Sequence, residues 1–206
     1  MPARLTPRRI ADDVIEFEAG SPRHAQHLAS AIRSLGLAED VVAGLDRVSV
    51  RFNPSAADEV TDALNALDYT DDIEPNLTPP VEISVSYGGE NGPDLEAVSA
   101  ALNISTDAFI GSHTQRIHTV EMIGFTPGFS YISGLPAEHR VSRLATPRHR
   151  VPAGAVGVSA GFTGIYALDG PGGWPLIGRT EAKLFNARSE TPFLLTPGQR
   201  VKFRAL

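Results

Sequence analysis

Polar and apolar positions in the first part of the chain predict alternating strands and helices. The stretch Val14–Phe17, which is apolar except for Glu16, predicts a short strand. The pair Ser21–Pro22 is typical of a helix start, and apolar residues then recur every three or four positions until Gly36 ends the helix. The run Val48–Phe52 alternates with period two, as expected of a half-buried strand.

A second helix and two more strands complete this pattern. The stretch Val41–Leu45 is expected to pair with the strand that follows it, and Ser55 is expected to cap the second helix. The apolar face of that helix is formed by Val60, Leu64 and Leu67. Val81–Tyr87 alternates again and predicts a strand. The order strand, helix, strand, strand, helix, strand is the split βαβ pattern of ferredoxin-like folds.

The pattern changes after residue 81. Leu95–Leu102 predicts a short helix, and Ser105 is expected to cap another that runs to Ile110. From Thr119 onward, short apolar runs are interrupted by glycine and proline, and most of the 19 glycines lie in this part of the chain. Such spacing is typical of a β-barrel or a β-sandwich.

We therefore predict an α+β protein with two domains. The first is a small ferredoxin-like α/β domain over residues 1–80, and the second is a β-rich domain over residues 81–206. Thr78–Pro80 is the predicted linker. The strand Val81–Tyr87 has two possible positions, because it can complete the first sheet or begin the second domain.

Composition excludes several classes of protein. The 206 residues include 18 basic and 24 acidic ones, and the net charge of −6 argues against a nucleic-acid surface. The absence of cysteine excludes disulfides, thiolate zinc sites and a cysteine nucleophile, and it fits a reducing compartment. We find no secretory signal and no apolar stretch of about 18 residues, so we expect a cytoplasmic protein without a membrane span.

Two motifs of nucleotide and metal sites are missing. The chain has only two lysines, Lys183 and Lys202, and neither follows a glycine, so there is no G-x-x-x-x-G-K-[ST] phosphate loop. There is no H-E-x-x-H sequence either. His113 and His118 are five positions apart without a carboxylate motif between them, and we predict no metal site.

A dense series of short motifs occupies the second part of the chain. The series comprises Tyr87-Gly-Gly, Gly92-Pro-Asp-Leu95, His113, Gly124–Tyr131, Pro147–Gly154, Thr163–Tyr166 and Pro171–Thr180. In this order, the motifs resemble the family of the 5-oxoprolinase B subunit. That family is also called allophanate hydrolase subunit 1, and it includes an inhibitor of a sporulation histidine kinase. The resemblance covers residues 81–206, is weaker over residues 1–80, and implies a cyclophilin-like β-barrel after a small α/β domain.

This sequence departs from the family pattern at two positions. His118 stands where the family commonly has tyrosine. Phe162 stands where it often has glutamine, which removes a possible polar contact to a ligand.

Three residues in these motifs are candidates for catalysis. Arg148 and Arg179 each offer a planar guanidinium suited to carboxylate or phosphate, and His113 can donate a proton near neutral pH. The alternatives are solvated surface arginines and a helix C-cap contact for the histidine. Asp94 is expected to cap a helix. We predict that the three candidates converge on one concavity, with Tyr131 and Trp174 nearby as walls.

Five aromatic residues are candidates for substrate binding: Tyr87, Phe125, Tyr131, Tyr166 and Trp174. Some of these rings are expected to pack in the core, while others line a pocket. For Trp174, the two interpretations are a buried anchor and an aromatic wall for a planar ligand.

The resemblance implies one component of an ATP-dependent 5-oxoprolinase, a hydrolase that opens 5-oxo-L-proline to L-glutamate. It implies that the C subunit, also called allophanate hydrolase subunit 2, is the direct partner, and that the A subunit completes the reaction. It also implies that ATP with Mg²⁺ binds in the assembled complex. We expect the chain to be inactive alone. The alternatives are an allophanate or urea carboxylase-like component, and a binding module that inhibits a sensor histidine kinase.

Overall fold

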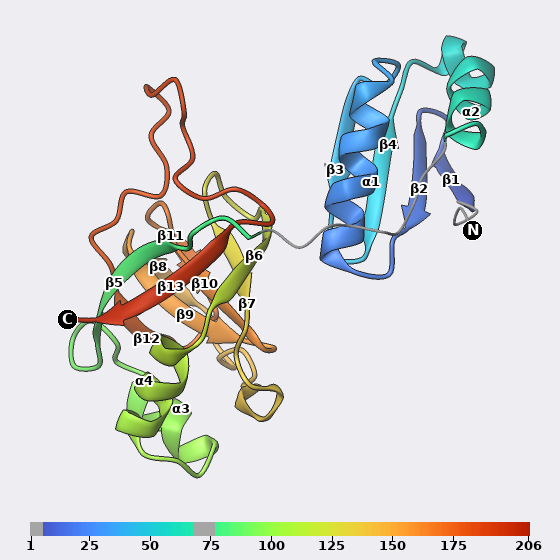
Figure 1. The fold of residues 1–206 in the computed structure, drawn as a ribbon. Coiled ribbons are helices and arrows are strands. Elements are labelled where there is room, and N and C mark those ends of the chain that lie inside the picture. The colour runs from blue at the N-terminus through green and yellow to red at the C-terminus, as the bar shows by residue number, and fades with distance from the viewer. Residues whose placement is uncertain (1–5, 68–76) are drawn as a thin grey trace. The chain divides into compact units, whose positions relative to one another are not determined.

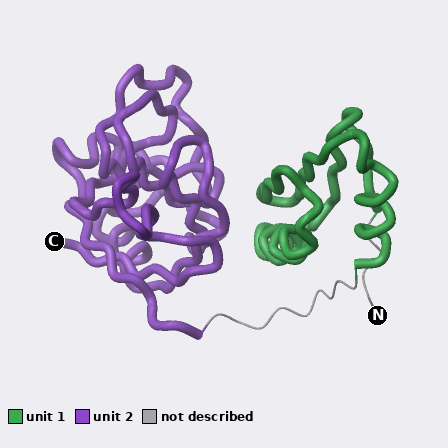
Figure 2. The backbone as a smooth tube through the Cα atoms, turned by 90° about the horizontal axis from the view of Figure 1, so that it is seen from above, with its two compact units in different colours: residues 1–75 green, residues 76–206 purple. Residues whose placement is uncertain are grey.

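The structure is a computed structural model that describes residues 6–67 and 77–206. The chain divides into two compact units, residues 1–75 and 76–206 (Figure 2), and each unit is considered by itself. Helices and largely antiparallel strands both occur, so the α+β class is confirmed. The assignment of residues 1–80 and 81–206 to two domains stays a prediction.

The first unit contains a four-stranded antiparallel sheet with the order β1-β2-β4-β3 (Figure 1). Its strands are β1 (Pro7–Ala11), β2 (Val14–Glu18), β3 (Asp40–Ala43) and β4 (Arg47–Arg51). Helix α1 (Pro22–Ser34) connects β2 to β3, and β4 lies between those strands. These elements form a split βαβ unit, as the sequence pattern predicts.

The fourth strand of this sheet differs from the ferredoxin-like order predicted. The place beside β2 is taken by β1 in a hairpin, whereas Val81–Tyr87 belongs to the second unit. All five residues of β1 are exposed, and they include Pro7, Arg8 and Arg9. An edge strand without a buried face has no alternation in its sequence, so the pattern did not reveal it.

Helix α1 begins as predicted. The Ser21 side chain accepts a hydrogen bond from the backbone N–H of His24 at 3.3 Å and so caps the helix. One face of the helix is buried against the sheet; its residues are Ala25, Leu28, Ala29 and Ile32. The sheet contributes Ile15, Phe17, Val48 and Val50 to the same core.

The start of the second helix differs from the prediction. A single 3₁₀ turn, η1 (Pro54–Ala56), precedes α2 (Ala57–Asn65), and Ser55 lies inside that turn. The cap is Asn53, whose side chain accepts a hydrogen bond from the Ser55 backbone at 3.0 Å. Ser55 was predicted because serine favours helix starts, but asparagine does so equally.

Seven strands of the second unit close into a barrel with the order β10-β7-β6-β13-β5-β12-β9. They are β5 (Val81–Tyr87), β6 (His118–Ile123), β7 (Ser130–Ser133), β9 (Ala155–Ser159), β10 (Phe162–Ile165), β12 (Leu176–Arg179) and β13 (Arg200–Ala205). A separate two-stranded sheet joins β8 (Arg148–Val151) to β11 (Gly170–Gly172). Of the two predicted β architectures, the barrel is therefore the correct one.

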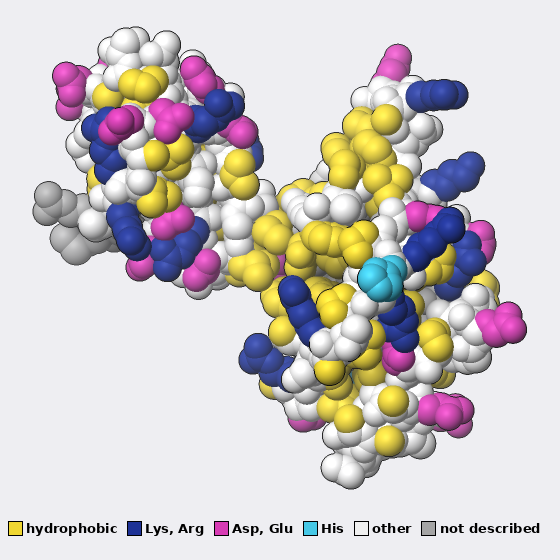
Figure 3. All heavy atoms as spheres, turned by 180° about the vertical axis from the view of Figure 1, so that it is seen from behind, with side chains coloured by type: hydrophobic (Ala, Val, Ile, Leu, Met, Phe, Trp, Pro, Cys, Tyr) yellow, Lys and Arg dark blue, Asp and Glu magenta, His cyan; other side chains and the backbone are white. Residues whose placement is uncertain are grey.

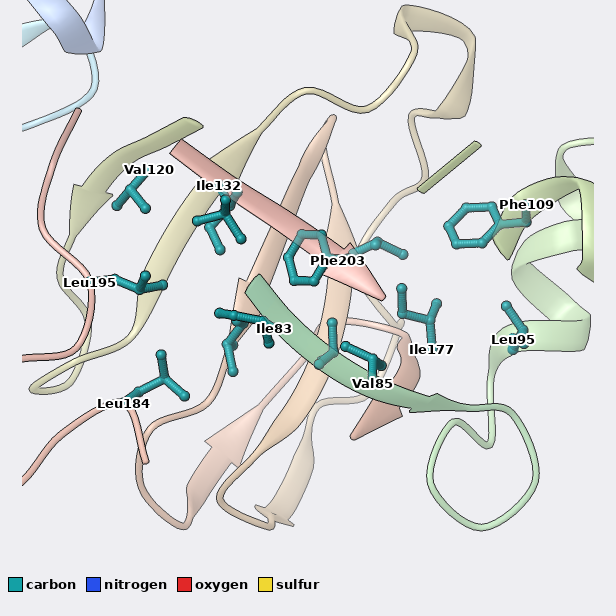
Figure 4. Close-up of a cluster of buried hydrophobic side chains, with 14 of the residues drawn as sticks. Ile83, Val85, Leu95, Phe109, Val120, Ile132, Ile177, Leu184, Leu195 and Phe203 are labelled. Carbon is teal, nitrogen blue, oxygen red and sulfur yellow. The ribbon is translucent and has the colours of Figure 1, made fainter. Parts of the chain in front are cut away.

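The interior of the barrel is packed with apolar side chains from several strands. Ile83, Val85, Val120, Ile132 and Phe203 are all fully or almost fully buried (Figure 4). Two helices, α3 (Leu95–Ala101) and α4 (Thr106–Gln115), add Leu95 and Phe109 to the same cluster. The barrel interior is thus a solid core rather than a channel.

Helix α4 is longer than predicted. Ser105 caps it as expected, by accepting a hydrogen bond from the Ala108 backbone at 3.1 Å, but the helix continues to Gln115. His113 therefore lies in the last helical turn instead of beyond the helix. Among the described residues, no helix has the length and apolar character needed to cross a membrane.

Candidate functional site

A cavity of about 210 Å³ on the second unit is lined mainly by aromatic rings. Its walls include Phe125, Tyr131, Tyr166 and Trp174, and Arg143 contributes a cation. Four of the five aromatic residues predicted for substrate binding thus lie in one place. Figure 3 shows hydrophobic side chains gathered over one face of this unit, with Lys and Arg side chains around them.

The cavity is built around the ring of Phe129, which is 2% exposed. Four rings meet it edge to face, at centroid distances of 5.5 Å for Phe125, 5.0 Å for Tyr131, 5.0 Å for Tyr166 and 5.6 Å for Trp174. Aromatic pairs favour this geometry, because the positive edge of one ring faces the negative face of another. The mutual contacts hold the cavity walls in place without a ligand.

Strand pairing and a glycine allow these rings to approach one another. Tyr131 on β7 pairs with Gly164 on β10. A Cβ atom at Gly164 would lie 2.7 Å from both the Phe129 and Trp174 rings, closer than real Cβ contacts. The absence of a side chain at this position is therefore required for the aromatic cluster.

Phe125 stands out at the rim of the cavity. Its backbone has a φ of 71°, and its side chain is 62% exposed. A left-handed conformation is rare for a bulky residue, and strained residues of this kind cluster at binding sites. The turn between β6 and β7 thus places an exposed aromatic ring over the cavity.

The electrostatics of the cavity favour neutral tyrosines beside a cation. Burial raises the pKa of Tyr131, and the Arg143 charge offsets part of this effect. Burial likewise raises the pKa of Tyr166, and a backbone hydrogen bond at Trp174 opposes the shift, as does Arg143. Both phenols therefore stay protonated at neutral pH and can donate hydrogen bonds to a ligand.

A second cavity of about 210 Å³ is lined by three arginines, Arg148, Arg150 and Arg179, together with Glu90. Arg148 and Arg179 therefore share a concavity, as predicted. Each arginine already faces a carboxylate. Arg148 Nη2 lies 2.8 Å from Asp94, Arg150 Nη2 lies 2.6 Å from Asp169, and Arg179 Nε lies 3.9 Å from Glu181.

The predicted helix-capping role of Asp94 is wrong. Asp94 occupies the N-cap position of α3 but makes no side-chain hydrogen bond to that helix. One carboxylate oxygen accepts from Arg148, and the other accepts from the Leu176 backbone N–H at 2.6 Å. Asp94 thus orients Arg148. Among the described residues, the second terminal nitrogen of Arg148 is buried without a hydrogen-bond partner.

The prediction that His113 joins the arginines and the aromatic walls in one concavity is wrong. His113 is fully buried, and its Nδ1 lies 2.5 Å from the Tyr87 hydroxyl, while its Nε2 lies 2.9 Å from Thr163 Oγ1. Tyr87 therefore lines neither cavity. Burial lowers the pKa of His113 well below its usual value, as do the nearby His118 and His139. A neutral, enclosed imidazole is a structural group, and the cause is the extended α4 helix, which turns it inward.

The two departures from the family pattern have different surroundings. Phe162 packs against Tyr131 with ring centroids 6.3 Å apart, so it extends the aromatic cluster. Both ring nitrogens of His118 face backbone oxygens, at 2.8 Å for His113 and 3.1 Å for Ser133. Burial lowers the pKa of His118, and these two carbonyls oppose the shift.

Sequence reasoning missed two features of this unit. Arg143 carries no motif of its own, and its position five residues before Arg148 in the same loop was the available signal. Gly157–Gly161 reads G-x-S-x-G, the pattern of a hydrolase nucleophile turn. In the structure it crosses a β-hairpin, and Ser159 is 3% exposed with its hydroxyl 3.5 Å from the Val141 carbonyl. A buried hairpin serine lacks the exposed strand-to-helix turn that this chemistry requires.

Within residues 6–67 and 77–206, no group of three or more histidine, aspartate or glutamate side chains is arranged to hold a metal ion. The aromatic cavity and the arginine cavity are the candidate sites on the second unit that contain the residues predicted from the sequence. They flank the same segment, because Pro147 lines the first and Arg148 lines the second.

Comparisons with known proteins agree with one another. The family model of the carboxyltransferase domain, subdomain C and D, matches residues 10–195. The 5-oxoprolinase B subunit of Escherichia coli O157:H7 is 35% identical over 198 residues, which is 92% of this chain and 90% of that protein. The protein of the same name from Haemophilus influenzae is 47% identical over 123 residues, 60% of this chain and 58% of that one. A urea amidolyase from Lachancea kluyveri is 44% identical over 55 residues, which is 24% of this chain and 3% of that protein.

A similar solved structure is that of TTHA0988, with a TM-score of 0.81 and 32% identity over 98% of this chain and 41% of that one. The chain thus matches less than two thirds of the Haemophilus protein and of TTHA0988, and nearly all of the Escherichia coli protein. The family model over most of the chain and the match along the Escherichia coli protein lead to one conclusion. This protein belongs to the carboxyltransferase subdomain C and D family, among the proteins called 5-oxoprolinase B subunits.

Proposed function

We propose that the chain is one component of an ATP-dependent 5-oxoprolinase, a hydrolase that opens 5-oxo-L-proline to L-glutamate. One observation carries the proposal: the similarity to the 5-oxoprolinase B subunit of Escherichia coli O157:H7 extends over 92% of this chain and 90% of that protein. A match along both whole chains leaves few residues of either protein without a counterpart. It therefore supports a shared role more strongly than a match to one segment.

The aromatic cavity has the properties that such a substrate requires. A five-membered lactam is small and nearly flat, and it can pack against the aromatic wall that includes Tyr131 and Trp174. The protonated hydroxyls of Tyr131 and Tyr166 are donors for the lactam carbonyl. Small-molecule sites generally combine apolar walls with a few polar groups of this kind.

The chemical difficulty is the stability of the lactam. Phosphoryl transfer from ATP to the carbonyl oxygen makes the ring carbon electrophilic. Addition of one water then breaks the ring C–N bond as the nitrogen takes up a proton, which leaves an acyl phosphate. A second water releases phosphate and gives glutamate. The transferred phosphoryl group carries negative charge in the transition state and in the acyl phosphate, so nearby cations stabilise it.

ATP with Mg²⁺ is proposed to bind in the assembled complex and not in this chain alone. Three arginines line one cavity, but Arg148, Arg150 and Arg179 each face a carboxylate, and about 210 Å³ is small for a nucleotide. These residues fit a contribution to a shared site better than a complete one. The proposed assembly includes the C subunit as the direct partner and the A subunit as a third protein, in the cytoplasm.

The experiment is reconstitution. The chain is co-purified with its candidate C subunit, the A subunit is added, and consumption of 5-oxo-L-proline and ATP is measured. We expect activity only with all components, and none with this chain alone. Hydrolysis of ATP that depends on 5-oxo-L-proline in the pure chain would show that partners are unnecessary. No consumption by the complete mixture would refute the substrate.

A role in urea metabolism is the second candidate. The supporting observation is the 44% identity to a urea amidolyase over 55 residues, a much shorter match. The same reconstituted mixture distinguishes the two. Turnover of urea but not of 5-oxo-L-proline would favour a urea carboxylase-like role.

A further inference from the structure

The aromatic cavity contains a cation whose charge is not neutralised. Arg143 lines this cavity and is exposed. Among the described residues it has no ion pair or hydrogen bond, whereas Arg148, Arg150 and Arg179 each have a carboxylate within 4 Å. A guanidinium without a counter-ion, placed beside apolar walls, attracts an anion from solution.

The groups around Arg143 restrict the class of anion that can bind beside it. The charge of Arg143 acts on both Tyr131 and Tyr166, so the guanidinium lies near the two phenols. Within the described part of the chain, the Tyr131 hydroxyl has no hydrogen-bond partner. A planar fork of N–H groups and a nearby O–H match the two oxygens of a carboxylate.

The rest of the cavity selects for the remainder of the ligand. The walls formed by Phe125, Tyr131 and Trp174 are apolar and suit a ring. A phosphate group would instead require polar surroundings. A volume of about 210 Å³ lies below the usual range for drug-sized ligands, which begins at about 300 Å³. The ligand is therefore small. It combines a compact ring with one anionic group.

We propose that the aromatic cavity binds small cyclic carboxylates, with Arg143 paired to the carboxylate and the ring packed against the aromatic wall that includes Tyr131 and Trp174. The inference rests on the proposed function in one respect, since 5-oxo-L-proline is a ligand of this class. In this proposal, Arg143 discriminates between substrates with and without a carboxylate. No motif in the sequence indicated that role.

The test measures binding to the full chain by titration calorimetry and ligand-observed NMR. The probes are 5-oxo-L-proline, pyrrole-2-carboxylate, and 2-pyrrolidone, which has the same lactam ring without the carboxylate. The variant is Arg143→Ala, and Arg143→Lys tests for partial rescue. The matched control is Arg140→Ala, because Arg140 is exposed in the same segment but does not line the cavity.

We expect the parent chain to prefer 5-oxo-L-proline over 2-pyrrolidone. Arg143→Ala should weaken binding of the carboxylates by about 10- to 150-fold, as for loss of a charge-assisted hydrogen bond, and leave 2-pyrrolidone unchanged. Arg140→Ala should bind like the parent. Thermal melting of each variant checks that the fold is intact.

The outcomes separate the two proposals. If 5-oxo-L-proline binds equally well to the parent and to Arg143→Ala, the role of Arg143 is refuted and the proposed substrate stands. If pyrrole-2-carboxylate binds through Arg143 and 5-oxo-L-proline does not bind, the site stands and the proposed substrate fails. If neither carboxylate binds, the cavity is not a carboxylate site.

Discussion

The hydroxyl of Tyr87 on β5 lies 2.5 Å from Nδ1 of His113 on α4, and the contact joins the barrel to the helix at its end. The other ring nitrogen of His113 meets Thr163 on β10, so the imidazole connects three elements. The ring of Phe203 stacks on His113 at 4.3 Å. Polar groups enclosed in this way are costly to leave unpaired, which makes the contact a structural determinant of the barrel.

Tyr87→Phe tests that role. The substitution removes one hydroxyl and leaves His113 Nδ1 unpaired, so we expect the free energy of unfolding to fall by about 1–3 kcal/mol. Chemical denaturation followed by fluorescence measures it. The matched control is Tyr131→Phe, because that hydroxyl has no partner among the described residues, and its loss should change stability little. Equal effects from the two substitutions would contradict the structural role.

The stability of the second unit should depend on pH through its buried histidines. Burial lowers the pKa of His113 and of His118 in the folded chain, whereas the unfolded chain binds these protons near pH 6.5. Stability is therefore fully present above about pH 6.5 and is lost as the pH falls below it. Each histidine that stays neutral in the folded state contributes a slope of up to about 1.4 kcal/mol per pH unit.

Denaturation midpoints at pH 7.5, 6.5 and 5.5 measure this slope. His113→Gln should reduce the slope even though it also lowers stability at pH 7.5. His149→Gln, at an exposed position, is measured alongside as the matched substitution. A slope that is identical in the parent and in His113→Gln would show that His113 does not titrate on unfolding.

The ion pair between Arg148 and Asp94 should contribute measurably to stability. The Asp94 side chain is 17% exposed, so removing its partner leaves a largely buried carboxylate without its counter-charge. We expect Arg148→Ala to cost about 1–3 kcal/mol of unfolding free energy. Arg150→Ala is the control, because its pair with Asp169 is more exposed and should contribute much less to stability. Thermal and chemical denaturation of both variants tests the difference.

The same variant tests the arginine cavity. In the reconstituted complex, Arg148→Ala should lower 5-oxoprolinase activity by about 10- to 150-fold if its guanidinium contacts an anionic group. Full activity at a temperature well below its melting point would place Arg148 outside the reaction and leave it as a structural partner of Asp94.

Gly164→Ala should disrupt the aromatic cavity. Its Cβ would lie 2.7 Å from the rings of Phe129 and Trp174, and relieving that overlap is expected to cost about 1–3 kcal/mol. Tryptophan fluorescence reports the displacement of the single Trp174. Gly170→Ala is the matched control, since nothing lies within 4 Å of its Cβ position. If the two variants have the same stability and spectrum, the rings have more freedom than the structure shows.

Much of the first unit follows from local pattern. The apolar spacing of α1, its Ser21 cap and the alternation in β2 and β4 all predict elements that are present. The exposed strand β1 was missed, because an edge strand buries no face and has no period. The end of α4 was misplaced, because Gly111 interrupts the apolar pattern while hydrogen bonding continues to Gln115.

The candidate site was predictable in part. Motif resemblance found Phe125, Tyr131, Tyr166 and Trp174, which come from separate segments and meet around Phe129. Which cation lies beside these rings depends on the tertiary fold, and no local spacing in the sequence predicts it. Pro147 lines the aromatic cavity and its neighbour Arg148 lines the other one, because successive residues of an extended chain point to opposite sides.

The parallel pairing of β5 with β13 also has a kinetic consequence. Val81 is opposite Val201, and Val85 is opposite Ala205, so the ladder joins segments about 120 residues apart in the chain. Long-range pairings of this kind form slowly, because the loop between them must close before they add stability. During synthesis, β5 leaves the ribosome long before its parallel partner β13 has been made. The barrel therefore stays open until β13 has been made, and the β5 edge is exposed to aggregation during that interval.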